Sequence, residues 1–156
     1  MKRILFATLI LFALSGCSNN APVNSNIPYA SVSFAIDVAV SGADNELREG
    51  MLGNSKIYTT THPATLSTSF GRYGYSGVVV VRAYDDRLYA FDICCTNEVD
   101  RNIALESDGF FLKCPKCGST FEIGNGYGIV NQGPAIQPLK NYKVTGYSGD
   151  RYQVSN

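Results

Sequence analysis

The sequence predicts an all-β domain, a small β-sandwich or barrel, and three observations support this. The chain contains 15 Gly, 10 Tyr and 8 Phe but no Trp, a composition that suits strands and turns. Apolar residues recur with a period of two or in short runs, and no long segment has a helical period. The length of 156 residues allows one domain of ordinary size.

The first predicted strand covers residues 29–40, where apolar side chains alternate with polar ones. This period of two is typical of a strand with one buried face. A single helical turn at 46–50 and a β-prone segment at 57–60 follow. Four consecutive valines at 78–81 predict a strand that is buried on both faces.

Short strands separated by turns make up the second half of the chain. Asp85 and Asp86 form a turn signal that predicts a hairpin with the valine strand, and Ser148-Gly149-Asp150 predicts a second hairpin. The remaining strands are predicted at 88–91, 109–112, 121–123, 142–144 and 152–154.

The N-terminus predicts a secretory signal rather than a spanning helix. Lys2 and Arg3 precede a short apolar segment, and small residues follow directly before Cys17. Residues 1–17 therefore resemble a bacterial lipoprotein signal with its lipobox, in which Cys17 would receive the lipid. An ordinary secretory signal is the alternative.

The predicted domain organisation follows from this signal. Residues 18–28 are polar and predict a flexible tether, and residues 29–156 form the domain. We expect an extracytoplasmic protein that is anchored to a bacterial membrane by lipid, on its periplasmic or cell-surface face. The 13 basic and 13 acidic residues balance, which argues against a nucleic-acid partner.

The cysteines other than Cys17 are the candidates for chemistry. They form two groups, the adjacent pair Cys94-Cys95 and the Cys114-Pro-Lys-Cys117 motif. Each group follows a predicted strand, so two loops could meet around one centre. Thiolates are good ligands for zinc, iron and iron–sulfur clusters.

The cysteine motifs resemble those of the Rieske [2Fe–2S] family. The segment 114–121 (CPKCGSTF) is similar to the family's second box, C-P-x-H-G-S-x-F, with Cys117 in the histidine place. In the first box, C-x-H, Cys95 matches the cysteine and Asn97 replaces the histidine. Gly133-Pro134-Ala135 resembles the proline loop of the family. The resemblance implies a Rieske-like fold with a small cluster-binding subdomain, here over 92–134, inserted between framework strands.

Both ligand histidines of the family are therefore replaced. We expect Cys95, Cys114 and Cys117, with Cys94 as the fourth ligand, to bind a [2Fe–2S] cluster. The protein would then transfer electrons to an unidentified redox partner protein and have no catalytic activity of its own. The alternatives are a zinc ion, a mononuclear iron, or no metal with disulfides between the loops, in a protein that serves as a binding or structural module.

Other polar residues have simpler interpretations. The single histidine, His62, is expected in a surface loop. Lys116 and Asp100 stand where the family has its loop-bridging disulfide. A cluster of five acidic residues near the first cysteine loop is interpreted as a solvated turn. These residues are Asp85, Asp86, Asp92, Glu98 and Asp100.

Overall fold

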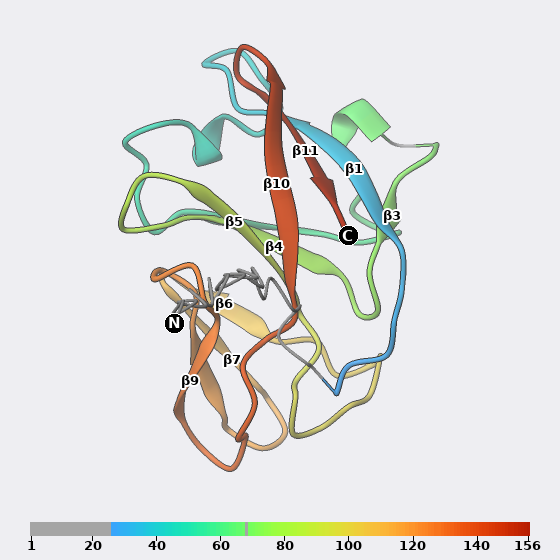
Figure 1. Cartoon of the computed structure of the whole chain (residues 1–156), viewed down its shortest axis with the longest axis vertical. Helices are drawn as coiled ribbons and strands as arrows, with labels where there is room; N and C mark the ends of the chain where they lie inside the picture. Colours follow the sequence, from blue (N-terminus) through green and yellow to red (C-terminus); the bar gives the residue numbers. More distant parts are fainter. Residues whose placement is uncertain (1–25, 68) are drawn as a thin grey trace, which may run out of the picture.

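The computed structural model describes residues 26–67 and 69–156, and within them the chain forms two sheets and two short 3₁₀ helices (Figure 1). The predicted signal 1–17, with Cys17, lies outside the described residues, as does the tether before Asn26. No helix in the described part is both long enough and apolar enough to cross a membrane.

Seven strands form one sheet, which we call the framework sheet. Its order is β2-β4-β5-β10-β11-β1-β3, and every pairing is antiparallel. The strands are β1 (Val32–Asp37), β2 (Ser55–Tyr58), β3 (Arg72–Tyr73), β4 (Val78–Arg82), β5 (Leu88–Asp92), β10 (Asn141–Ser148) and β11 (Arg151–Ser155). The 3₁₀ helices are η1 (Asn45–Leu47) and η2 (Thr65–Ser67).

Four short strands form the second sheet in the order β6-β7-β8-β9. They are β6 (Glu106–Asp108), β7 (Phe111–Lys113), β8 (Thr120–Glu122) and β9 (Ile129–Gln132). The chain leaves the framework sheet after β5 and returns to it at β10, so this sheet is inserted between framework strands, at the lower end in Figure 1. We call this sheet and its loops the cysteine subdomain.

Strand β4 separates two hydrophobic cores, which explains its four valines. Val78 and Val80 point into the framework core with Phe34, whereas Val79 and Val81 pack against the cysteine subdomain. Side chains alternate between the faces of a strand, so apolar residues are needed at successive positions where both faces are covered, as at the four valines. The prediction of a doubly buried strand is confirmed.

The all-β prediction is confirmed, and most predicted strands are present with small shifts of their ends. Strand β1 is shorter than predicted because the chain turns after Val38, where Gly42 N donates to Ala39 O at 2.8 Å. Val40 is consequently 79% exposed rather than part of the buried face. Strands β3, β6 and β9 were not predicted, and the helical turn expected at 46–50 is the 3₁₀ helix η1.

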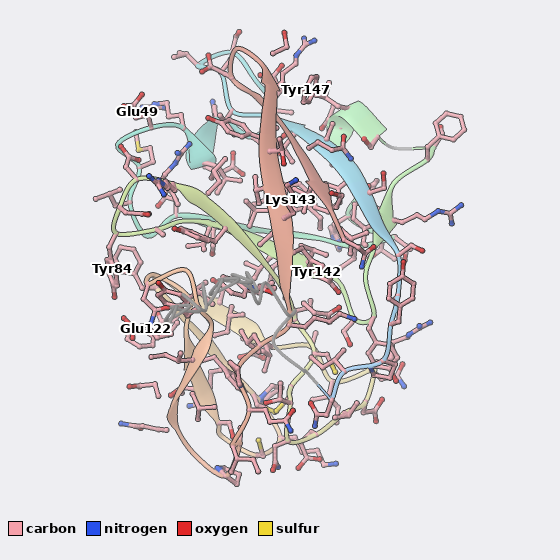
Figure 2. The ribbon with its side chains drawn as sticks, in the orientation of Figure 1. Glu49, Tyr84, Glu122, Tyr142, Lys143 and Tyr147 are labelled. Carbon is pink, nitrogen blue, oxygen red and sulfur yellow. The ribbon has the colours of Figure 1, made fainter. Side chains whose placement is uncertain are left out.

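Contacts at the β4–β5 hairpin join the two sheets. Tyr84, in this hairpin, packs its ring against Phe110 with the ring centroids 4.2 Å apart. Its backbone N–H donates to the carbonyl of Gly124 at 2.9 Å. Figure 2 shows Tyr84 beside Glu122 of β8 at this junction. The hairpin therefore fixes how the cysteine subdomain sits on the framework.

Candidate metal centre

Three cysteines from two loops converge at one point of the cysteine subdomain. Cys95 follows β5, and Cys114 and Cys117 lie in the connection between β7 and β8. The three Sγ atoms all lie within 4.8 Å of one another, and those of Cys95 and Cys117 are 3.6 Å apart. Cys95 and Cys114 are buried, while Cys117 is partly exposed. The two loops meet around one centre, as the sequence predicted.

The backbone of the Cys-x-x-Cys segment forms a tight turn that directs both sulfurs inward. Gly118 N donates to the carbonyl of Cys114 at 3.0 Å, and Cys114 N donates to the carbonyl of Ser119 at 2.8 Å. Gly118 has a φ of +73°, a conformation that favours glycine. This backbone conformation explains why a glycine follows Cys117.

Ser119 is the matched serine of the second box, to which the motif alone assigned no role. Its buried hydroxyl accepts hydrogen bonds from Cys117 Sγ at 3.1 Å and from the backbone of Ala135 at 3.1 Å. Gly133 packs so closely here that a Cβ atom would lie 2.5 Å from Ser119 Cα. The segment 133–135, which resembles the proline loop, therefore supports the cysteine turn directly.

Asp92 is fully buried, so its interpretation as part of a solvated turn is wrong. Its carboxylate accepts four hydrogen bonds, which together compensate its burial. The donors are Tyr75 N at 2.7 Å, Ser76 N at 3.2 Å, Cys94 N at 2.9 Å and the Tyr142 hydroxyl at 2.7 Å. These donors come from three separate segments, so Asp92 ties the first cysteine loop to the framework sheet. No sequence pattern signals such a role.

A salt bridge joins the two cysteine loops at the surface. Lys116 Nζ lies 2.7 Å from a carboxylate oxygen of Glu98. Asp100, the other position matched to the disulfide of the family, instead accepts hydrogen bonds from Asn102. An exposed ion pair contributes little free energy. The loops are thus held mainly by packing and by the cysteine cluster itself.

The pKa values of Cys95 and Cys117 are shifted in opposite directions. Burial raises the pKa of the Cys95 thiol to about 12, and the Cys114 and Cys117 thiols add to this rise. Burial also opposes ionisation of Cys117, but hydrogen bonds from the side chain and backbone of Ser119 outweigh it and lower the pKa of Cys117. Cys117 is therefore the thiol of this pair that ionises more readily.

Cys94 and Asn97 lie apart from the three sulfurs. The Cys94 thiol is buried and points toward the carbonyls of Cys95 and Asp100, at 3.7 Å and 3.9 Å. Burial and the charge of Asp92 raise the pKa of Cys94. Asn97 is exposed, and its amide donates to Glu98 at 3.3 Å. The role of Cys94 as fourth ligand stays a prediction, and it requires the loop to rearrange.

The donor set fits a metal that prefers thiolates. Zinc–sulfur bonds of about 2.3 Å in a tetrahedron separate the sulfurs by about 3.8 Å. The 3.6 Å between Cys95 and Cys117 is close to that value. A [2Fe–2S] cluster needs four protein ligands divided between two irons, so it requires one more ligand and a wider arrangement. The three cysteines thus offer the donor atoms and the spacing that suit a soft metal, and the fourth position decides which one.

The comparisons with known proteins address the fold and the N-terminus. A chain in the complex of reduced oxygenase and oxidized ferredoxin in carbazole 1,9a-dioxygenase superposes with a TM-score of 0.50 and 18% identity, covering 80% of this chain and 93% of that chain. The Sphingomonas yanoikuyae B1 ferredoxin has a TM-score of 0.38 and 23% identity, covering 51% of this chain and 74% of that chain. No curated protein matches this chain. The family model for the prokaryotic membrane lipoprotein lipid attachment site matches residues 1–18.

The chain thus has a Rieske-like ferredoxin fold, as the two cysteine motifs predicted. It also carries a prokaryotic lipoprotein attachment site, in agreement with the predicted signal. That Cys17 itself receives the lipid stays a prediction. Two features therefore define the protein so far: a Rieske-like β-domain with a cysteine centre, and an N-terminal lipid attachment site.

Proposed function

We propose that this protein is a lipid-anchored electron carrier with a [2Fe–2S] cluster bound by Cys95, Cys114, Cys117 and Cys94. The observation that supports it is the convergence of three thiols from the two loops that correspond to the Rieske boxes. When bound, the cluster would supply one-electron redox chemistry. Cys17 would carry the lipid, and the domain would work on the extracytoplasmic side of a bacterial membrane with a redox partner protein.

The side chains around the cysteines have defined tasks in this proposal. Once Cys117 is a thiolate, the Ser119 hydroxyl, 3.1 Å away, would donate a hydrogen bond to its sulfur and stabilise the negative charge there. Asp92 holds the backbone of Cys94 and so the start of the first loop. Four thiolates carry more negative charge than two thiolates and two imidazoles. We therefore expect a reduction potential near that of plant-type ferredoxins, about −400 mV.

A second candidate is a single tetrahedral ion, most simply zinc, in a protein that acts as a binding or structural module. The compact arrangement favours it, because all three sulfurs lie within 4.8 Å of one another. The fourth position would then be taken by solvent or by Cys94. Zinc has no redox chemistry, so this candidate excludes electron transfer.

Metal and sulfide content of protein purified without oxygen separates the candidates. Two irons and two acid-labile sulfides per chain, with an EPR signal after reduction, would support the cluster. One zinc per chain would establish the second candidate. Colourless, metal-free protein without free thiols would contradict both and indicate disulfides.

Two cysteine variants sharpen the distinction. Cys114→Ser removes a sulfur of the converging group and should abolish metal binding in either candidate. Cys94→Ser tests the proposed fourth ligand, because the Cys94 thiol is equally buried but lies outside the group of three. Loss of iron in Cys94→Ser would support its role as fourth ligand, and unchanged metal content would remove Cys94 from the site.

A further inference from the structure

The described chain enters the domain at the end that holds the cysteines. Asn26 Nδ2 donates to the carbonyl of Thr96 at 2.6 Å, and Asn26 N donates to Gln137 Oε1 at 3.0 Å. Thr96 follows Cys95 directly and donates its hydroxyl to the carbonyl of Gln137 at 2.7 Å. The point of entry is thus fixed between the first cysteine loop and the loop that supports Ser119.

Large exposed side chains surround this point of entry. Ile136, next to Gln137, is 91% exposed, and Tyr29 is 77% exposed. Lys140 lies over the ring of Tyr29, 5.5 Å from its centroid, and donates to the carbonyl of Pro28 at 3.1 Å. An apolar side chain, a tyrosine and a lysine with a long apolar stem are groups that favour the interface of a lipid bilayer. We call Tyr29, Ile136 and Lys140 the entry surface.

The distance between lipid and domain is limited by the covalent chain. Eight residues lie between Cys17 and Asn26, so the two are joined by nine Cα–Cα steps. They span at most about 30 Å when fully extended. A compact domain of this length is about 36 Å across. If the β10–β11 hairpin faced the bilayer, the chain from Cys17 would need to be at or beyond full extension, whereas the cysteine end needs little of that length.

We propose that the domain lies with its entry surface against the lipid surface, so that the cysteine centre faces the bilayer. This orientation rests on lipid attachment at Cys17, which is part of the proposed function, but it does not depend on which metal is bound. The chemistry of the surface suits the boundary between headgroups and acyl chains, because an exposed isoleucine gains by leaving water while Tyr29 and Lys140 keep their polar ends in it. The opposite end, with Tyr147 at the top of Figure 2, points away from the membrane.

The absence of tryptophan from the chain makes this orientation measurable. Ile136→Trp and Tyr29→Trp each place a single fluorescent reporter in the entry surface. Tyr147→Trp is the matched control, because Tyr147 is 55% exposed but lies in the β10–β11 hairpin at the opposite end. Each acylated full-length variant is reconstituted into phosphatidylcholine vesicles, with and without brominated acyl chains, which quench tryptophan at short range.

We expect bromolipid to quench Ile136→Trp and Tyr29→Trp several-fold more strongly than Tyr147→Trp. Equal quenching at the two ends, or stronger quenching at Tyr147→Trp, would overturn the orientation. Vesicle sedimentation separates this result from the proposed function: protein that does not sediment with the vesicles lacks the lipid anchor, and then both fail. Metal content measured on the same samples tests the cofactor independently of the quenching.

Discussion

The framework sheet and the cysteine subdomain differ in strand length and in what fills their interiors. Strand β10 of the framework has eight residues, whereas β6, β7 and β8 of the subdomain have three each. The framework core consists of aromatic and aliphatic side chains, such as Phe34 packed 4.9 Å from Tyr58 between ring centroids. The core beside the subdomain includes two of the three converging cysteines.

This difference teaches how stability is divided within the domain. A buried thiol contributes less apolar surface than a leucine or phenylalanine, so part of the subdomain's stability must come from elsewhere. The framework sheet supplies one surface through Val79 and Val81, and a metal would supply another constraint. We therefore expect the framework to fold without metal and the subdomain to depend on it more strongly.

The largest expected effect comes from removing an aromatic ring from either core. Phe34→Ala should cost about 3–5 kcal/mol, because a fully buried phenylalanine leaves a cavity. That loss should unfold both regions together, since the subdomain rests on the framework. Phe121→Ala, at the centre of the other core, should instead melt the subdomain first and leave the framework strands protected. Hydrogen exchange resolved by strand measures the difference.

The control for this comparison is Phe70→Ala. Phe70 is 88% exposed, so its removal should change the free energy of unfolding by less than about 0.5 kcal/mol. If Phe34→Ala and Phe121→Ala unfold the same strands in one transition, the two regions form a single cooperative unit and the proposed division of stability is wrong.

The next largest loss of unfolding free energy is expected on changing Asp92, whose carboxylate joins the two regions. Asp92→Asn keeps the shape but turns an amide N–H₂ toward donors, so two or more hydrogen bonds to a charged acceptor are lost. We expect a cost of about 3 kcal/mol. Tyr142→Phe is the milder comparison, since it removes only one donor at 2.7 Å and should cost about 1 kcal/mol. Thermal unfolding of both variants tests the order, and a smaller loss in Asp92→Asn than in Tyr142→Phe would contradict it.

A smaller effect should be confined to the cysteine subdomain. Gly133→Ala combines a φ of +97° with a Cβ that would lie 2.5 Å from Ser119 Cα, and should cost about 2 kcal/mol. The displaced Ser119 should weaken metal binding more than it lowers the melting temperature of the framework. Gly109→Ala serves as the control, because its φ of +58° is similarly strained but nothing lies within 4 Å. Equal metal affinity in both variants would show that the close approach is unimportant.

Much of the framework sheet could be predicted because the order of apolar and polar residues in its strands indicates which faces are buried. In β1 apolar residues alternate with others, which indicates one buried face. In β4 four valines follow one another, which indicates that both faces of the strand are buried. Strand β6 could not be found in this way, since all three of its residues are exposed and carry no apolar period. Its hairpin with β7 depends on Gly109 and on the neighbouring strand.

Three of the four cysteines predicted for the centre converge in the structure, whereas the residues that support them were predicted only in part. The motif spacing placed Cys95, Cys114 and Cys117 together because each group follows a strand end. Ser119 and Asp92 went unnoticed as supports, because their partners are distant in sequence or are backbone groups that leave no residue pattern. Whether Cys94 turns toward the centre depends on loop geometry, because adjacent side chains of an extended chain point to opposite faces.

The smallest expected effect concerns Lys56 in β2, the edge strand of the framework sheet. Burial alone would lower the pKa of Lys56, but hydrogen bonds to Glu46 and Asp44 and their charges raise it above 10.5. The folded state therefore gains stability that is complete below pH 10.5 and is lost as pH rises through the higher, folded pKa. Lys56→Met should cost about 1 kcal/mol at neutral pH. The difference in unfolding free energy between Lys56→Met and wild type should vanish in strongly alkaline solution. Urea unfolding at neutral and at strongly alkaline pH measures it, and an equal difference at both would contradict the prediction.

The position of β1 in the framework sheet has a consequence for how the protein is made. This strand pairs with β11 on one side, and Val32 N donates to Asn156 Oδ1 across 124 positions of sequence. Contacts between such distant segments form slowly, and they require residues 151–156 to be available. During synthesis β1 therefore lacks this partner until residues 151–156 have been made. If the protein is exported as we propose, this late pairing would keep the sheet open while the chain crosses the membrane.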